Sequence, residues 1–162
     1  ESLGSVAVNN AVRAVLPELL KDFHVVHLCG KGKIDDSLKN LPGYVQFEYI
    51  KEELKDLFAL ADIVISRAGA NAICELLALH KPTLLIPLSA NASRGDQILN
   101  ARSFERQGFS LVLEEENLTN TSLLDTIHKL YNNRESYINA MKKSSQQDSI
   151  DTIIHLIEQA AK

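Results

Sequence analysis

One stretch of the sequence, residues 63–100, repeats the same order of elements twice. Apolar runs at residues 63–65 and 83–87 are each followed by a loop of small or polar residues and then by a helical pattern, at residues 70–79 and 96–107. Successive strand–loop–helix units are typical of a parallel α/β sheet, which binds ligands where loops leave the carboxyl ends of its strands. Helix N-termini at that edge attract anions. We hypothesise that this stretch holds a nucleotide-sugar.

The rest of the sequence continues the alternation and predicts one mostly parallel sheet with helices on both faces, a three-layer α/β domain. Pro17 lies inside a helical pattern and predicts a kink or break, because proline has no amide hydrogen. Gly108 predicts the end of the helix before it. Further strands are predicted over residues 24–29, 44–49 and 109–113, a helical turn within residues 34–41, and further helices over residues 8–20, 52–61, 121–131, 134–143 and 149–161.

Composition limits the class of protein. The 162 residues are 45% hydrophobic and 23% charged, which is ordinary for one folded domain with a substantial core. A net charge of −4 argues against bulk affinity for nucleic acid. No apolar run approaches the roughly 20 residues of a membrane span. Cys29 and Cys74 lie in apolar segments and are predicted to be buried thiols in a reducing compartment, and no Cys/His cluster has zinc spacing.

The first loop of the repeated stretch carries candidate binding residues. Gly69 lets the backbone approach a ligand, and the helix that begins at Ala70 would present free amides to a phosphate. Arg67, at the strand end, is placed to reach the same anion or a base. Glu75 lies on a helix face away from the apolar stripe, where a carboxylate can accept two ribose hydroxyls. The alternative for Glu75 is a solvated carboxylate on a surface helix.

The second helix of the stretch begins with polar side chains. Asp96, Gln97 and Asn100 supply the directional donors and acceptors that sugar hydroxyls require, and Gln97 and Asn100 share a face. The alternative is a capped amphipathic helix without a ligand, with Asp96 near its start. Residues 30–33, Gly-Lys-Gly-Lys, lack the spacing of a P-loop and predict a plain turn.

Residues 1–5 predict a glycine turn that leads into a helix. In a parallel α/β domain such a turn normally follows a strand, and no strand pattern stands before this one. We therefore expect the chain to be part of a longer protein.

Together these segments resemble the donor-binding half of the MurG-type glycosyltransferases, the peptidoglycan N-acetylglucosaminyltransferases. The resemblance covers nearly the whole chain. It implies that residues 1–162 form a Rossmann-like domain, the C-terminal half of a two-domain GT-B fold, without the first strand. Three matches lie in the repeated stretch: Ser-Arg-Ala-Gly-Ala at residues 66–70 with Glu75, Pro82 with Ile86-Pro87, and Asp96-Gln97 with Asn100-Ala101. Three more lie before it. Residues 2–5 match the end of the family's GGSxG[AS] loop, His27 with residues 30–32 matches its HxxGKG segment, and Tyr49-Ile50 matches an aromatic–Ile pair.

The resemblance implies a role for each candidate residue. The backbone of Ile50 and the side chain of Arg67 would border the uracil, and Tyr49 would stack on it or cap it. Glu75 would bind the ribose, and Ser2 with Gly69 and Ala70 would face the diphosphate. Contacts with phosphate or sugar hydroxyls would come from Asp96, Gln97 and Asn100.

Two residues depart from the family pattern. Glu1 stands where the family has glycine. Asp96 replaces a neutral polar residue, and a second negative charge beside a diphosphate is unfavourable. We therefore expect Asp96 to cap its helix or to bind a sugar hydroxyl.

The implied activity is inverting transfer of N-acetylglucosamine from UDP-N-acetylglucosamine to the lipid-linked muramoyl-pentapeptide. It would take place at the cytoplasmic face of the bacterial membrane, with peripheral membrane association and without a metal, another cofactor or nucleic acid. The general base and the acceptor and membrane surfaces would lie in an N-terminal domain, so this chain alone is expected to bind donor weakly and to catalyse nothing. An apolar face at residues 150–157 would then be exposed.

Two alternatives stay open. One is the donor half of a related transferase that acts on another lipid. The other is a non-catalytic nucleotide-binding module, or a catalytic subunit that a separate partner chain completes.

Overall fold

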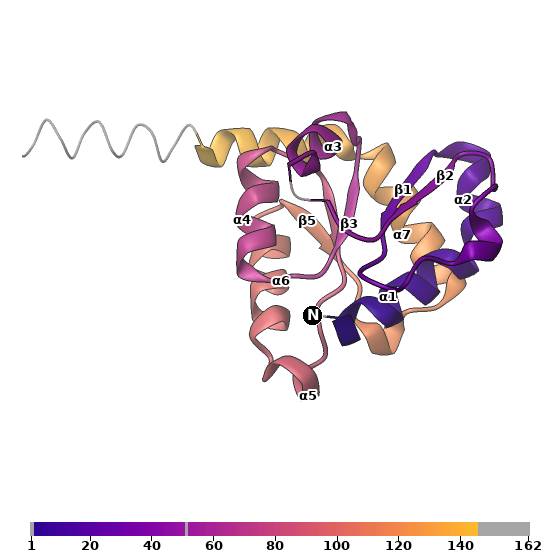
Figure 1. Cartoon of the computed structure of the whole chain (residues 1–162). Helices are drawn as coiled ribbons and strands as arrows, with labels where there is room; N and C mark the ends of the chain where they lie inside the picture. Colours follow the sequence, from indigo (N-terminus) through magenta and orange to yellow (C-terminus); the bar gives the residue numbers. More distant parts are fainter. Residues whose placement is uncertain (1, 51, 146–162) are drawn as a thin grey trace, which may run out of the picture.

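The computed structural model describes residues 2–50 and 52–145, and its elements alternate between helices and strands (Figure 1). This order confirms the predicted α/β class. The elements are α1 (Ser2–Ala14), α2 (Leu16–Asp22), β1 (Val25–Leu28), the 3-10 turn η1 (Asp36–Leu38), β2 (Tyr44–Phe47), α3 (Leu54–Leu60), β3 (Val64–Ser66), α4 (Ala70–Ala78), β4 (Thr83–Leu85), α5 (Ala90–Ser93), α6 (Asp96–Arg106), β5 (Ser110–Val112), the 3-10 turn η2 (Glu115–Asn117), α7 (Asn120–Asn132) and a helix over residues 134–145.

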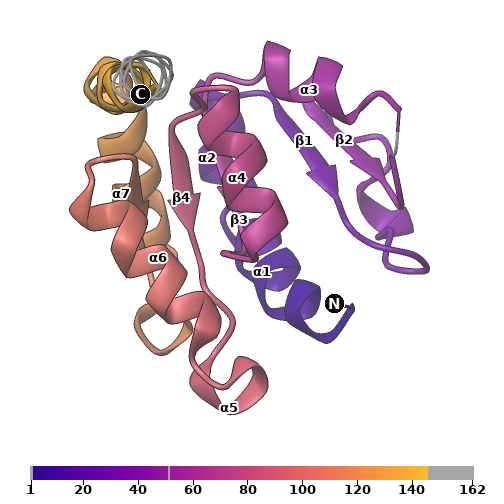
Figure 2. The same cartoon turned by 90° about the vertical axis from the view of Figure 1, so that its left-hand side faces the viewer.

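All paired strands are parallel, as predicted, but they form two sheets. β1 pairs with β2, with Val25 opposite Tyr44. β3, β4 and β5 form the second sheet in that order, with Ser66 opposite Leu85 and Leu85 opposite Val112. Within the described residues no ladder joins β1 to β3. The two sheets therefore stand apart between β1 and β3 (Figure 2).

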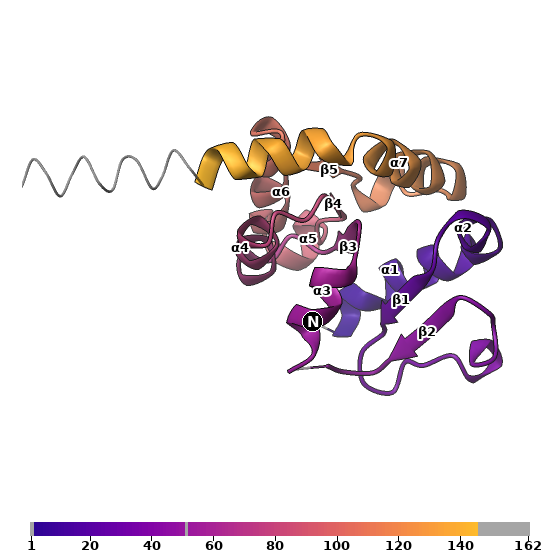
Figure 3. The ribbon, with the colours of Figure 1, turned by 90° about the horizontal axis from the view of Figure 1, so that it is seen from above.

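Helices cover both faces of the three-stranded sheet. Leu84 packs in a buried cluster with Val12 of α1 and Ile127 of α7. Leu85, the next residue along β4, packs on the opposite face with Ile73 of α4 and with α6. Figure 3 shows this sheet between α4 and α6 on one side and α7 on the other. Burial of successive residues on opposite faces confirms the three-layer arrangement.

Several local predictions are confirmed and others are wrong. The helical pattern breaks where predicted, because α1 ends at Ala14 and Pro17 lies in the first turn of α2, where no amide hydrogen is needed. The predicted glycine turn at residues 2–5 is instead the first turn of α1. The predicted loop at residues 88–95 contains α5. Cys29 is buried, but Cys74 is exposed because it lies on the outer face of α4. The predicted helix over residues 149–161 and the apolar face at residues 150–157 lie outside the described residues.

A buried polar network ties α1 to the two-stranded sheet. His27 is 8% exposed; its Nδ1 lies 2.6 Å from the Tyr44 hydroxyl and its Nε2 lies 2.8 Å from Asn9 Oδ1. Asn9 also donates from Nδ2 to the carbonyl of Cys29 over 2.8 Å. Because Asn9 Oδ1 can only accept, His27 donates from Nε2 and accepts the Tyr44 hydroxyl at Nδ1. Burial, aided by the positive charge of Arg13, lowers the pKa of His27 to about 4, so the ring is neutral at pH 7.

Candidate functional site

The loops that leave the carboxyl ends of β3 and β4 carry most of the predicted site. β3 ends at Ser66 and leads through Arg67 and Gly69 into α4. β4 leads through α5 into α6, which begins at Asp96. In Figure 1 the start of α1 lies at the same lower end of the molecule as α5. The topology therefore gathers both loops at one edge of the sheet, as the sequence predicts.

Gln97 and Asn100 fasten these loops together. Gln97 Oε1 accepts hydrogen bonds from the backbone amides of Ala68, over 3.2 Å, and Leu88, over 2.9 Å. Asn100 Nδ2 donates to the carbonyl of Ala68 over 3.0 Å. Two backbone donors on Oε1 fix the orientation of the Gln97 amide and turn Nε2 toward Gly69, where a Cβ would lie 3.8 Å from that nitrogen. The two side chains thus position the loops, and their predicted sugar contacts can use Gln97 Nε2, Asn100 Oδ1 and the second hydrogen of Asn100 Nδ2.

The start of α4 presents amide groups at this edge. Gly69 is the N-cap residue, without a side-chain cap, and the amide of Ile73 makes the first helical bond, to the Gly69 carbonyl over 3.1 Å. The amides from Ala70 to Ala72 have no acceptor within the helix, and the helix dipole adds positive potential there. Gly69 has φ −67, which any residue can adopt, so backbone strain does not require glycine at this position. The helix start is suited to an anionic group.

Arg67 lies across the ends of β3 and β4 and is held by a residue that the sequence interpretation missed. Its Nη1 donates to Glu115 Oε1 over 2.5 Å and to the carbonyls of Ile86, over 3.2 Å, and Pro87, over 3.3 Å. The side chains of Arg67 and Glu115 are 18% and 30% exposed. The place of Glu115 in the sequence could have indicated this contact. Glu115 follows β5 just as Arg67 follows β3, and the carboxyl ends of parallel strands meet at one edge of a sheet.

Replacing Glu115 with glutamine is expected to lower the free energy of unfolding by about 1 kcal/mol, because a neutral hydrogen bond replaces a partly buried charged one. Urea unfolding measures the change. Glu116→Gln, at the exposed neighbouring position in η2, is the matched control. Equal stabilities of the two variants would show that the Arg67–Glu115 pair does not hold this edge together.

Glu75 lies in the second turn of α4 and is half-buried. Ile73 and Leu76 of the same helix are buried, which confirms the predicted apolar stripe, and Leu77 is half-buried. Within the described residues the Glu75 carboxylate has no recorded hydrogen bond or ion pair. Its oxygens are therefore available to accept hydrogen bonds, and the ribose contact stays a prediction.

The remaining predicted residues lie around this core of the site. Tyr49 and Ile50 follow β2 in the other sheet, and Tyr49 is 68% exposed. Ser2 is the first residue of α1. Asp96 is exposed and is the first residue of α6, but Gly95, with φ +85, is the N-cap residue and no side chain caps the helix. The predicted capping role of Asp96 is therefore wrong, because a residue inside the helix does not face the free amides of its first turn.

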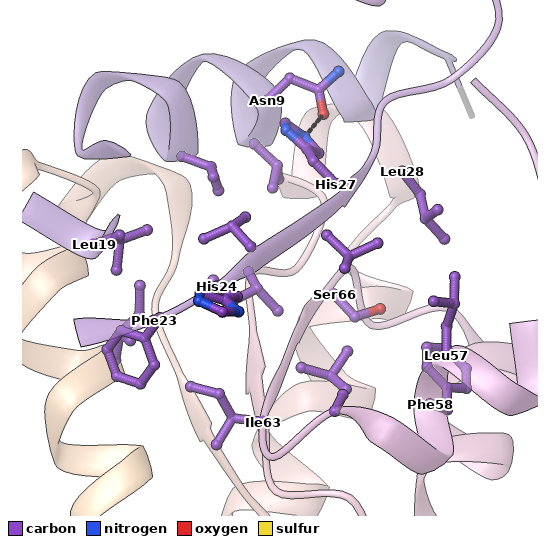
Figure 4. Close-up of a pocket in the computed structure, with 18 of the residues that line it drawn as sticks. Asn9, Leu19, Phe23, His24, His27, Leu28, Leu57, Phe58, Ile63 and Ser66 are labelled. Carbon is purple, nitrogen blue, oxygen red and sulfur yellow. Dashed lines mark hydrogen bonds between the residues drawn. The ribbon is translucent and has the colours of Figure 1, made fainter. Parts of the chain in front are cut away.

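The described residues contain no group of three or more histidine, cysteine or acidic side chains arranged to hold a metal ion. A cavity of about 430 Å³ meets the candidate site only at Ser66 and Arg67 and otherwise lies between the two sheets (Figure 4).

Comparison with known proteins gives a family. The model of the glycosyltransferase family 28 C-terminal domain matches residues 2–157. A Lachnospira eligens protein named UDP-N-acetylglucosamine–N-acetylmuramyl-(pentapeptide) pyrophosphoryl-undecaprenol N-acetylglucosamine transferase is 68% identical over 161 residues, which are 99% of this chain and 46% of that protein. A protein of the same name from Lachnoclostridium phytofermentans is 64% identical over 98% of this chain and 44% of its own length. The chain therefore spans about half the length of the curated relatives it matches.

Solved glycosyltransferases share the fold. The Acinetobacter baumannii MurG crystal structure superposes with a TM-score of 0.67 and 24% identity over 98% of this chain and 49% of that one. The kitacinnamycin glycotransferase superposes with a TM-score of 0.70 and 18% identity over 83% of this chain and 33% of that one. These structures show the shared fold, and the family model, which matches residues 2–157, shows that the chain belongs to glycosyltransferase family 28, as its C-terminal domain.

Proposed function

We propose that this chain is the donor-binding domain of an inverting transferase that moves N-acetylglucosamine from UDP-N-acetylglucosamine to the muramoyl-pentapeptide lipid of peptidoglycan synthesis. The names of the relatives that are 68% and 64% identical support this substrate pair. The observation that carries the proposal is the loop edge itself. The free amides of α4 lie beside the amide groups of Gln97 and Asn100, which are anchored on the same loop.

Each part of this edge suits one part of the donor. The start of α4, from Gly69 to Ala70, with Ser2 at the start of α1, would hold the diphosphate through amides and helix dipoles. Glu75, without a recorded partner among the described residues, would accept the ribose hydroxyls. The implied roles of the other residues are uracil binding by Tyr49, the Ile50 backbone and Arg67, and sugar binding by Asp96, Gln97 and Asn100.

These residues bind and orient the donor, and no catalytic residue is assigned among them. Amide groups and a helix N-terminus aimed at the diphosphate would also stabilise the negative charge that develops as UDP leaves. The general base and the acceptor site would belong to the N-terminal part of a longer protein.

Under this proposal the complete enzyme associates peripherally with the cytoplasmic face of the bacterial membrane, where its lipid acceptor lies, and serves cell shape and division. Residues 2–50 and 52–145 include no helix with the length and apolar character needed to cross a bilayer.

The ribose assignment predicts a specific loss of affinity. Glu75→Ala should raise the Kd for UDP about tenfold, a loss of about 1.4 kcal/mol, because one charged acceptor is removed. Titration by NMR of this chain and of the longer protein measures it, with Glu135→Ala on the exposed face of the last helix as the control. The wild type should prefer UDP over 2′-deoxy-UDP, and Glu75→Ala should lose that preference.

Equal affinities of the wild type and Glu75→Ala for UDP would refute the ribose assignment. Failure of both this chain and the longer protein to bind UDP or UDP-N-acetylglucosamine at millimolar concentration would refute the proposed function.

A further inference from the structure

Arg94 has an unusual backbone conformation for an arginine. Two non-glycine residues of the described chain have a positive φ, His80 with φ 55 and Arg94 with φ 58. Arg94 ends α5 with ψ 20, in the left-handed region where a Cβ is crowded and glycine is preferred. The side chain of His80 contacts the last helix, since its Nε2 lies 3.2 Å from Ser145 Oγ. The side chain of Arg94 makes no recorded hydrogen bond or ion pair with other described residues, so no such contact accounts for arginine at this position.

The loop from β4 to α6 holds Arg94 at the edge of the sheet that carries the candidate site. Gly95, with φ +85, follows Arg94 and is the N-cap residue of α6. Gln97 fastens this loop to the β3–α4 loop, because its Oε1 accepts from the amides of Leu88 and Ala68. In Figure 1, α5 lies at the same lower end of the molecule as the start of α1. Arg94 therefore belongs to the edge where the free amides of α4 lie.

The surroundings of Arg94 are open. Arg94 is exposed, and a Cβ added at Gly95 would meet no atom within 4 Å. A ligand at this edge of the sheet can therefore approach the turn without displacing another described side chain.

Charge distinguishes Arg94 from the other arginine on these two loops. Arg67 pairs with Glu115 over 2.5 Å, and both side chains are partly buried, so the charge of Arg67 is already offset. Asp96, two residues after Arg94, is exposed and adds a negative charge to the same loop. A diphosphate bound here needs a positive charge against its own charge and that of Asp96. Arg94 is the residue of the β4–α6 loop that can supply this charge.

We propose that Arg94 is a specificity-determining residue that binds the diphosphate of the nucleotide-sugar donor. Its guanidinium donates charge-assisted hydrogen bonds to phosphate oxygens, which arginine can make in parallel pairs. This inference rests on the proposed function and extends it, because the residues assigned to the diphosphate there, Ser2, Gly69 and Ala70, are all uncharged.

A second diphosphate has the same chemistry, because the names of the relatives describe an acceptor with a pyrophosphoryl group. The attachment of the β4–α6 loop to Ala68, two residues before the start of α4, favours the donor. Binding and kinetic measurements distinguish the two sources.

Titration with ligands that differ in phosphate content tests the proposal. Arg94→Gln should raise the Kd for UDP about tenfold, because a charged donor to phosphate is lost. The Kd for uridine, which has no phosphate, should stay within about twofold of the wild type. Arg106→Gln makes the same change of charge at the exposed last turn of α6 and should bind both ligands like the wild type. NMR titration of this chain and of the longer protein measures these values.

Equal Kd values of the wild type and Arg94→Gln for UDP would overturn this inference alone. Equal losses of affinity for UDP and uridine would overturn it as well, because they would show that Arg94 shapes the loop and does not meet a phosphate. Failure of the wild type to bind UDP in either form would instead refute the proposed function, and this inference with it.

A glycine substitution separates the backbone of Arg94 from its side chain. Arg94→Gly keeps the left-handed conformation without a crowded Cβ, which offsets the greater freedom of glycine in the unfolded chain. The Tm of this variant should therefore be close to or above that of the wild type, whereas its Kd for UDP should rise about tenfold. Unchanged affinity would show that Arg94 serves only to end α5, and the proposal would be wrong.

Kinetics of the longer protein separate the two diphosphates. Arg94→Gln should raise the KM for UDP-N-acetylglucosamine about tenfold and leave the KM for the lipid acceptor unchanged. A rise in the acceptor KM with an unchanged donor KM would place Arg94 at the acceptor diphosphate and overturn the proposal.

Discussion

Replacing Gln97 with leucine is expected to lower the free energy of unfolding by about 2–3 kcal/mol. Leucine fills a similar volume but cannot accept the hydrogen bonds that Oε1 receives from the amides of Ala68 and Leu88. Ala68 is fully buried, so its amide loses its acceptor without gaining water. Each buried donor left in this way costs about 1–3 kcal/mol, and the partly exposed Leu88 costs less. Urea unfolding should show a lower midpoint with an unchanged slope.

Gln97→Glu is the matched control, because it keeps a side-chain oxygen for both amides. Its stability should stay within about 1 kcal/mol of the wild type. Under the proposed function its affinity for UDP-N-acetylglucosamine should still fall, since a negative charge replaces Nε2 beside the diphosphate position. A leucine variant as stable as the wild type would mean that Gln97 does not fasten the two loops.

Acidification from about pH 6.5 to about pH 4 is expected to lower the free energy of unfolding by about 2–3 kcal/mol through His27 alone. The pKa of His27 is about 4 in the folded chain, chiefly because of burial. In the unfolded chain it is near 6.5, so between these values the unfolded state binds more protons and is favoured as pH falls. Protonation would also place a donor at Nδ1, against the Tyr44 hydroxyl, and would add a charge near Arg13.

Urea unfolding at pH 7, 5.5 and 4.5 measures this dependence for the wild type and His27→Gln. Between pH 7 and pH 4.5 the free energy of unfolding of His27→Gln should fall less than that of the wild type, because the contribution of His27 is absent. His128→Gln is a useful contrast, because a hydrogen bond to the Leu124 carbonyl and then Asp22 raise the pKa of His128. The contribution of His128 is present at low pH and lost as pH rises, which is the opposite sign. Identical pH profiles for the wild type and His27→Gln would show that His27 does not carry the acid sensitivity.

Local sequence patterns predicted most of the elements because their signals are short-range. Pro17 lies in the first turn of α2, just after the break that ends α1, Gly108 follows α6 with φ +82, and the apolar runs near residues 64 and 84 are strands. The same patterns gave wrong predictions for residues whose burial depends on packing against segments distant in the chain. Cys74 was predicted to be buried from its apolar surroundings, but only the packing of α4 decides which of its faces is exposed.

Sequence patterns likewise predicted only part of the candidate site. Residue type and spacing pointed to Gln97 and Asn100, but they could not show that one end of each side chain binds the backbone of the loop between β3 and α4. They also did not point to Glu115, because its contact with Arg67 joins residues far apart in the sequence. The capping role predicted for Asp96 failed because a glycine in the left-handed conformation occupies the cap position.

The amino-acid sequence by itself determined the α/β class, the parallel direction of the strands and the loops that carry the site, because periodicity and turn residues act within a few positions. Only the tertiary structure decided that the strands form two sheets, that a cavity with two strand edges separates β1 from β3, and that Glu115 holds Arg67. The physical reason is that hydrogen-bond ladders and ion pairs depend on distances between segments, which local patterns do not specify.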